Sequence, residues 1–430
     1  MRINKLRLEN FKCFDRQEFT FSRRFTVLIG DNATGKTTVL DALAVALGSF
    51  LLGIEDVSAR GILPNEIRTI DIDGQPRPQK PVIVAATGEV NGHNIDEWRR
   101  EIISKNTTHA GAKVISNAAK KMLIESRKPH NERDGEVIFP LIVYHGTGRL
   151  WAEHEKIVYQ HQIEGVVRGY TNALSAKSSS KEFLSWFKTQ EDSIKKFDNV
   201  LEKSHFEAFK QVILAMLPPN RWHDLMWDNK NNVLVGIFRD DDGNTHRLSF
   251  SQLSDGYRNL IGMVADIAYR CIQLNPHLGL LAIKNTPGVV LIDELDLHLH
   301  PNWQRTIIRD LKAAFPSLQF IATTHSPFIV QSLEDGELIN LDKYDESINP
   351  ADLPLNMVVT DIMGVENIRS DSFDNRLTAA KIEFEKIKAS KTELTLDDYL
   401  AISKAAANLL QHETNDPVYE AYLEMTKRDD

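Results

Sequence analysis

Residues 30–37 read GDNATGKT, which matches the pattern G-x-x-x-x-G-K-[ST]. The stretch follows a short apolar run, FTVLI at residues 25–29, and precedes residues 37–47, whose apolar spacing predicts a helix. A strand, a glycine-bearing loop and a helix, in this order, can direct backbone N–H groups and a helix N-terminus at a phosphate. The stretch therefore predicts an α/β fold built around a phosphate-binding loop.

The residues of this loop have separate chemical roles. Lys36 is placed to reach the β- and γ-phosphates of a nucleoside triphosphate, and Thr37 to offer its hydroxyl to Mg²⁺. ATP and Mg²⁺ are therefore the expected cofactors. The other loop residues expected to bind the nucleotide are Gly30, Asn32, Gly35 and Thr38. The bare pattern also arises by chance, but its place between an apolar strand and a helix favours the functional interpretation.

An acidic pair follows a second apolar run, GVVLI at residues 288–292. A buried strand that ends here can place Asp293 beside the phosphate loop as a Mg²⁺ ligand. Glu294 would then face the γ-phosphate and orient or deprotonate the attacking water. Alone, this pattern could be a strand with an acidic end; with a phosphate loop upstream, the catalytic interpretation is preferred.

Residues 253–257 read LSDGY and come directly before an apolar helix that is expected to run to about residue 274. Ser254 as N-cap, followed by Gly256, makes a second helix N-terminus that can bind an anion. One chain cannot usefully direct two such termini at the same γ-phosphate, so this one is expected to serve a second copy. A simple helix cap is the alternative.

His325 lies in ATTHSP, residues 322–327, just past another apolar strand. A histidine there can donate to the γ-phosphate and sense its loss, whereas an isolated histidine is more often a satisfied core residue. The order of the motifs supports the first interpretation, because phosphate loop, serine-capped helix, acidic strand end and histidine follow one another along the chain.

This ordered set resembles the ABC-ATPase superfamily, in particular the soluble branch that includes RecF, SMC and OLD-type ATPases. Residues 295–301, LDLHLHP, are similar to a stretch of the OLD-type proteins. The resemblance implies an ABC-ATPase fold with a mixed sheet, an N-terminal antiparallel β subdomain, a helical insertion and a helical C-terminal extension. Zinc binding by His298 and His300 is an alternative for this stretch, but no further ligands lie at suitable spacing.

Several positions depart from the family pattern. Ala33 stands where glycine is common, and Asp255-Gly256-Tyr257 replaces Gly-Gly-Gln. No glutamine directly follows the apolar run at residues 137–144, and either Gln160 or Gln162 would have to supply it.

A narrower resemblance rests on shorter motifs. Residues 144–151, YHGTGRLW, and residues 415–419, NDPVY, look like the PtuA ATPases of Septu anti-phage systems and their retron-associated relatives. Those ATPases work with a separate HNH nuclease, and the resemblance implies such a partner here.

The order of the segments suggests four parts: residues 1–52 with the β-hairpin and phosphate loop, a polar helical insertion at 53–135, the rest of the ATPase core at 136–345, and a helical extension at 346–430. Within the insertion, helices are expected near residues 96–104 and 112–127. Helices are also expected over residues 181–216, and two or three strands over residues 223–250.

Composition excludes several classes of protein. The net charge of −9 disfavours a protein that coats nucleic acid by charge alone, although contact through a complex stays open. No apolar run reaches the roughly 20 residues that a membrane helix needs, and two distant cysteines fit a reducing cytoplasm. The residues thus favour an ATP-gated homodimer or higher homo-oligomer. A RecF-like ATPase that binds DNA directly is the alternative, while a transport subunit and a self-contained nuclease fit poorly.

Overall fold

The computed structural model describes residues 1–104, 106–148, 165–175, 181–197, 199–218, 221–342 and 349–365, besides Thr378 and Ile382. The chain divides into two compact units, Met1–Val358 and Val359–Asp430. All elements discussed below belong to the first unit. The expected C-terminal helices, Gln160, Gln162 and the motif at 415–419 lie outside the described residues.

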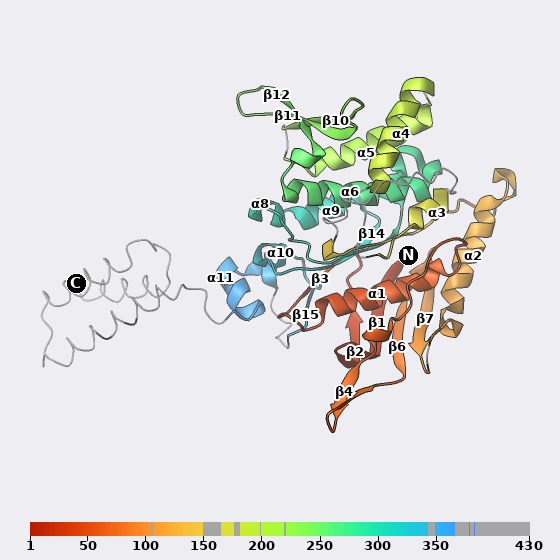
Figure 1. The fold of residues 1–430 in the computed structure, drawn as a ribbon, viewed down its shortest axis with the longest axis vertical. Helices are drawn as coiled ribbons and strands as arrows, with labels where there is room; N and C mark the ends of the chain where they lie inside the picture. Colours follow the sequence, from red (N-terminus) through yellow and green to blue (C-terminus); the bar gives the residue numbers. More distant parts are fainter. Residues whose placement is uncertain are drawn as a thin grey trace, which may run out of the picture. The chain divides into compact units, whose positions relative to one another are not determined.

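A five-stranded parallel sheet, in the order β15-β3-β14-β13-β9, forms the centre of the first unit (Figure 1). Its strands are β3 (Phe25–Ile29), β9 (Leu141–His145), β13 (Gly288–Ile292), β14 (Leu318–Thr323) and β15 (Leu338–Asn340). Every residue of β3, β9, β13 and β14 is buried, as expected of parallel strands that are covered on both faces. Because parallel strands end at one edge, the loops after β3, β13 and β14 meet there.

An antiparallel sheet, β2-β1-β6-β7-β8, comes from the N-terminal part of the chain. Its strands are β1 (Arg2–Phe11), β2 (Phe14–Thr20), β6 (Val82–Val90), β7 (His93–Ile102) and β8 (Thr107–Thr108). The pairing of β1 with β2 confirms the predicted hairpin. Gln319 of β14 links the two sheets, since its side chain accepts from Ile3 N and donates to Ile3 O, both at 2.8 Å. The α/β class with a mixed set of strands is therefore confirmed.

Helix α1 (Lys36–Leu51) follows the phosphate loop and packs against β6 and β7 as well as β13 and β14. Trp98 of β7 donates from Nε1 to Ala46 O at 3.0 Å. Sheet contacts on both sides bury α1 almost all round, in keeping with its mostly apolar sequence after Asp41. The helix thus holds the phosphate loop between the two sheets.

The segment expected as a helical insertion is partly a sheet. Helix α2 (Lys113–Arg127) confirms the expectation for residues 112–127, but the helix expected at residues 96–104 is wrong, because strand β7 occupies it. Trp98, Arg100 and Ile102 of β7 are all buried, and Arg100 donates to Arg60 O at 3.3 Å. Because the buried position 100 is an arginine, the alternation of apolar and polar residues that indicates a strand is interrupted. The apolar residues that remain have a spacing typical of a helix.

A layer of helices lies in the second half of the first unit (Figure 1). It includes α3 (Gly165–Tyr170), α4 (Lys181–Phe197), α5 (Val200–Ala215) and α6 (Asp255–Leu274). Trp186 of α4 contacts Phe209 of α5 and Tyr269 of α6, with ring centroids 4.9 and 5.6 Å apart. These aromatic contacts fix the position of α6, whose N-terminus carries Ser254.

Shorter elements complete the first unit. A three-stranded antiparallel sheet consists of β10 (Trp222–Asp228), β11 (Val233–Arg239) and β12 (Thr245–Ser249), as the sequence predicts. Two short helices, α8 (Pro301–Gln304) and α9 (Ile307–Ala314), lie between β13 and β14. Others are β4 (Thr69–Ile72), β5 (Gln75–Pro78), α7 (Ala282–Asn285), α10 (Pro327–Gln331) and α11 (Leu355–Met357).

The pairing of β6 with β1 can be tested at Gly88. A Cβ on this residue would lie 2.1 Å from Arg2 O, so Gly88→Ala must push the two strands apart. We expect a loss of about 1–3 kcal/mol in the free energy of unfolding, as for other overpacked sites. Gly262→Ala on α6 is the control, since its Cβ would meet nothing within 4 Å. Denaturant unfolding of both variants checks this, and full stability of Gly88→Ala would contradict the pairing.

Candidate nucleotide site

The loop at residues 30–37 joins β3 to α1 and adopts the conformation that a phosphate requires. Gly30, Ala33 and Gly35 have φ angles of 143°, 71° and 108°. Ala33 thus keeps the left-handed conformation at the position where the family pattern often has glycine. Successive turns of this kind point backbone N–H groups into one concavity.

Gly35 is the N-cap of α1 and has no room for a side chain. A Cβ there would lie 2.6 Å from Phe14 Cζ and 2.8 Å from Cys13 Sγ, both from the β1–β2 turn. The N-terminal hairpin therefore supports the phosphate loop directly, and glycine is required by both the φ angle and the packing.

Lys36 is held by its own loop. Its Nζ donates to Gly30 O at 2.6 Å and to Asp31 O at 2.8 Å, and the residue is 9% exposed. Burial lowers the pKa of the Lys36 ammonium, and the carboxylates of Asp342 and Asp31 act in the opposite direction. The positive charge of the Lys36 ammonium therefore lies next to the backbone groups of the phosphate loop.

Thr37 and Asp293 come together although 256 positions separate them. Thr37 Oγ1 lies 3.1 and 3.3 Å from the two carboxylate oxygens of Asp293, which is buried. A hydroxyl and a carboxylate are the hard oxygen donors that Mg²⁺ prefers, and two protein ligands leave the remaining positions for water and phosphate. The residues present therefore fit a Mg²⁺ ion bound together with a nucleotide.

Glu294 follows at the end of β13 with a φ of 52° and is half-buried. Its backbone N donates to Thr323 Oγ1 at 2.8 Å, and the same hydroxyl donates to Asp293 Oδ1 at 2.7 Å. The left-handed turn takes Glu294 out of the strand path. The Thr323 hydroxyl thus bonds to both acidic residues. Thr323 was not identified from the sequence, where the feature that could have pointed to it is a threonine at the end of β14, the strand that pairs with β13.

The loop after β14 carries His325, which is exposed. Its backbone N donates to Asp296 Oδ1 at 3.2 Å, and the neighbouring Thr324 Oγ1 donates to the same oxygen at 2.5 Å. Since β14 lies between β3 and β13, this loop shares an edge with Lys36 and Asp293. Asp296 was likewise not identified as a site residue from the sequence.

The N-terminus of α6 packs on the loop after β13. A Cβ on Gly256 would lie 2.4 Å from His298 O, and Asn259 Nδ2 donates to Leu297 O at 2.7 Å. Ser254 is the N-cap and is exposed, and its side chain makes no capping hydrogen bond. In the part of the chain that the structure describes, no recorded hydrogen bond joins Ser254 to Lys36. The exposed Ser254 hydroxyl therefore does not cap its own helix.

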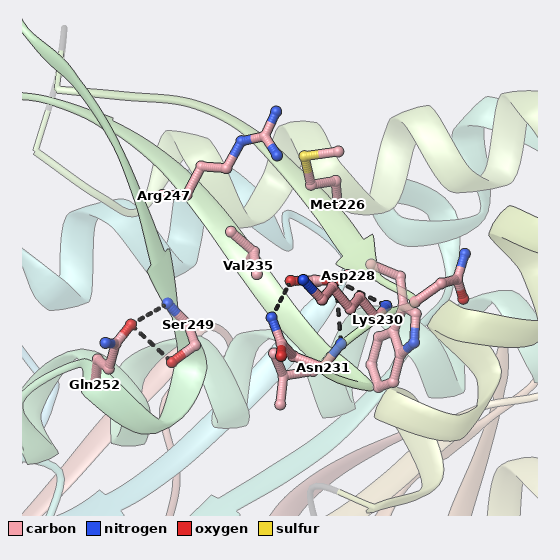
Figure 2. A pocket seen from close by; sticks show the side chains of 11 residues that line it. Met226, Asp228, Lys230, Asn231, Val235, Arg247, Ser249 and Gln252 are labelled. Atoms are coloured by element: carbon pink, nitrogen blue, oxygen red, sulfur yellow. Dashed lines mark hydrogen bonds between the residues drawn. The ribbon is translucent and has the colours of Figure 1, made fainter.

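A separate cavity of about 680 Å³ lies over the β10-β11-β12 sheet (Figure 2). Its lining includes Asp228, Lys230, Arg247 and Gln252, and none of the lining residues comes from β3, β13 or β14. The Asp228 carboxylate accepts from Asn231, which lowers the pKa of that carboxyl. The convergent phosphate loop and carboxylates point to the sheet edge, rather than this cavity, as the candidate nucleotide site.

Within the described residues, no group of three or more histidine, cysteine, aspartate or glutamate side chains is arranged to hold a metal ion by itself. None of the helices described in the chain is long and apolar enough to cross a membrane.

Comparisons with known families cover both halves of the first unit. Residues 5–211 match the family model described as "AAA domain". Residues 152–331 match the model described as "AAA domain, putative AbiEii toxin, Type IV TA system". The two matches together include the phosphate loop, the serine-capped helix, the acidic strand end and His325.

Curated relatives extend the match along the chain. "Retron Vc95 probable ATPase" from Vibrio cholerae serotype O1 biovar El Tor is 28% identical over 420 residues, covering 85% of this chain and 79% of that protein. "Septu protein PtuA" from Bacillus thuringiensis is 36% identical over 152 residues, covering 32% of this chain and 36% of that protein. Among solved structures, the SMC head bound to the C-winged helix domain of ScpA shows a TM-score of 0.45 and 17% identity, covering 79% of this chain and 93% of that one.

Three observations agree with one another: the order of the motifs, the parallel sheet that brings them to one edge, and the homology to retron and Septu ATPases. The two halves of the chain match AAA-domain families, and retron ATPases and Septu PtuA proteins are its homologues.

Proposed function

We propose that this protein is an ATP-gated dimeric switch that hydrolyses ATP in two composite sites. In each site, the phosphate loop of one copy faces the Ser254 turn of the other. The observation that carries the proposal is the N-terminus of α6: a 20-residue helix begins at an exposed serine whose hydroxyl does not cap its own backbone. Such a terminus attracts an anion.

The phosphate loop and Lys36 hold the triphosphate. The N–H groups of the loop donate to phosphate oxygens, and the Lys36 ammonium exchanges the carbonyls of Gly30 and Asp31 for the β- and γ-phosphates. Thr37 and Asp293 hold Mg²⁺, which neutralises charge on the phosphates when it is bound. Asn32, Gly35 and Thr38 complete the contacts of the loop.

Hydrolysis depends on the two residues that follow β13 and β14. Glu294 orients the attacking water and accepts its proton, and the turn at Thr323 holds its backbone in place. His325 donates to the γ-phosphate and loses that contact when the phosphate leaves. Ser254 and Gly256 of the partner copy close the site, so that loss of the γ-phosphate weakens the dimer.

The dimer is isologous in this proposal, because each copy supplies one phosphate loop and one Ser254 turn. Two equivalent sites result, and neither is complete in a single chain. A higher homo-oligomer can be built from such dimers. The free cysteines, Cys13 and Cys271, fit a cytoplasmic location.

Replacing Glu294 by glutamine keeps the shape of the side chain and removes the base. We expect Glu294→Gln to lower ATP turnover by about 10²–10⁴-fold and to accumulate as an ATP-bound dimer. Size-exclusion chromatography with light scattering, with ATP and Mg²⁺, measures the dimer. Glu334→Gln is the control, because the Glu334 side chain is 79% exposed and pairs with Lys312. A Glu294→Gln protein that stays monomeric with ATP and turns over normally would contradict the switch.

Measurement of ATP turnover with and without DNA separates this proposal from a RecF-like ATPase that binds DNA directly. Turnover by the isolated protein that rises several-fold with added DNA would favour the RecF-like function. Turnover that is indifferent to DNA until a second polypeptide is added supports a regulatory subunit.

The second polypeptide that we propose is a separate HNH nuclease in an anti-phage defence complex. The homology to a protein named "Septu protein PtuA" supports this assignment. In the proposal, nucleic acid is reached through the complex, and the ATP cycle controls when the nuclease acts.

An HNH protein encoded beside this chain should co-purify with it when the two are expressed together. We expect no DNA cleavage by the chain alone with ATP and Mg²⁺, and cleavage by the pair, because the proposed chemistry of this chain is confined to the triphosphate. An agarose-gel cleavage assay checks both arms. Cleavage by the isolated chain, or a neighbour that neither binds nor cuts, would contradict the partnership.

A further inference from the structure

The loop that follows β13 contains a half-buried carboxylate, Asp296, that the reaction scheme above does not use. One oxygen of Asp296, Oδ1, accepts from Thr324 Oγ1 at 2.5 Å and from His325 N at 3.2 Å. Both donors belong to the loop after β14. The bonds therefore tie the loop that follows Glu294 to the loop that carries His325.

Asp296 is held from both sides. Upstream, Leu295 N donates to Thr323 O at 2.8 Å; downstream, Asn259 Nδ2 donates to Leu297 O at 2.7 Å. Asp296 therefore sits between two fixed backbone positions, one on β14 and one on α6. These bonds hold the backbone on both sides of Asp296, so its carboxylate can serve as a support for the histidine loop.

Thr324 is buried, whereas His325 is exposed, so the two bonds to Asp296 act on a residue pair at the boundary between core and solvent. Without them, the backbone of His325 has fewer constraints than the strand that precedes it. A misplacement of a reacting group by about 1 Å can cost around 10²-fold in rate. The position of this backbone therefore matters for any contact that the imidazole makes.

We propose that Asp296 is a positioning residue that holds the His325 loop in the geometry needed for ATP hydrolysis. The proposal rests on the proposed ATPase function of the same site. Asp296 itself touches no phosphate in this scheme; it acts through the backbone of His325 and the hydroxyl of Thr324. Nucleotide binding, which depends on the phosphate loop, does not need it.

The test compares Asp296→Ala with Asp296→Asn in the full chain. Alanine removes the accepting oxygen, and we expect kcat to fall by about 10–100-fold with KM within about 3-fold of wild type. Asparagine keeps an accepting Oδ1 for both donors, and we expect it to restore most of kcat. Asp310→Ala is the matched control, because the Asp310 carboxylate accepts from the adjacent exposed Arg309 and lies outside the loops after β13 and β14.

A second measurement is independent of turnover. Amide hydrogen exchange of the segment around His325, in the nucleotide-free protein, should speed up in Asp296→Ala and remain slow in Asp296→Asn and Asp310→Ala. Thr324→Val removes one donor, and we expect a smaller loss of kcat. Combined with Asp296→Ala, it should add little, because the partner of that hydroxyl is already gone.

The outcomes are distinguishable. If the wild type hydrolyses no ATP, the proposed function fails first. If the wild type is active and Asp296→Ala keeps its kcat or leaves exchange near His325 unchanged, only the positioning role is overturned. A loss of ATP-dependent dimerisation with unchanged exchange would assign Asp296 to the subunit interface and would also overturn the proposal.

Discussion

The carboxylate of Asp293 joins the parts of the nucleotide site, and the remaining geometry depends on it. It lies within hydrogen-bond distance of the hydroxyls of Thr37 and Thr323, so it connects the phosphate loop to the ends of β13 and β14. Strands β3, β13 and β14 are parallel and fully buried, which brings their carboxyl ends to one edge although β3 is far from the other two in sequence. The phosphate loop is held from the other side by the β1–β2 turn, which packs against Gly35.

The loop after β13 connects this edge to the helical layer. It supplies Glu294 to the proposed reaction, Asp296 to the His325 loop and the carbonyl of Leu297 to Asn259 of α6, and the carbonyl of His298 packs closely against Gly256. The Ser254 turn, which we propose binds a partner's nucleotide, therefore packs on the same loop as Glu294 and Asp296 of its own chain. In the proposed dimer, the loop after β13 would connect the Ser254 turn at the interface directly with Glu294 and with the His325 loop.

Much of this fold could be predicted from the sequence, because apolar runs that end in phosphate-binding or acidic residues leave a clear pattern. The hairpin, the phosphate loop with its helix, the acidic strand and the strands at residues 222–249 all follow from spacing. Strand β7 did not, because Arg100 occupies an inward position and leaves Ile95, Trp98 and Ile102 at a helical spacing. Thr323 and Asp296 were also not identified as site residues, because a single threonine or aspartate has no recognisable sequence pattern. Their roles become visible only when the structure shows their hydrogen-bond partners. The composite character of the site stays a prediction, because it concerns a second copy.

The central claim is that Lys36 and Ser254 of different chains meet at one triphosphate, and mixing inactive subunits tests it most directly. Lys36→Met and Ser254→Glu each disable both sites of a homodimer. When the two proteins are mixed and allowed to exchange subunits, about half of the dimers contain one of each, and one of the two sites in such a dimer carries neither change. The account predicts that ATPase activity returns to up to about a quarter of the wild-type value, whereas a mixture no more active than its separate components would contradict it.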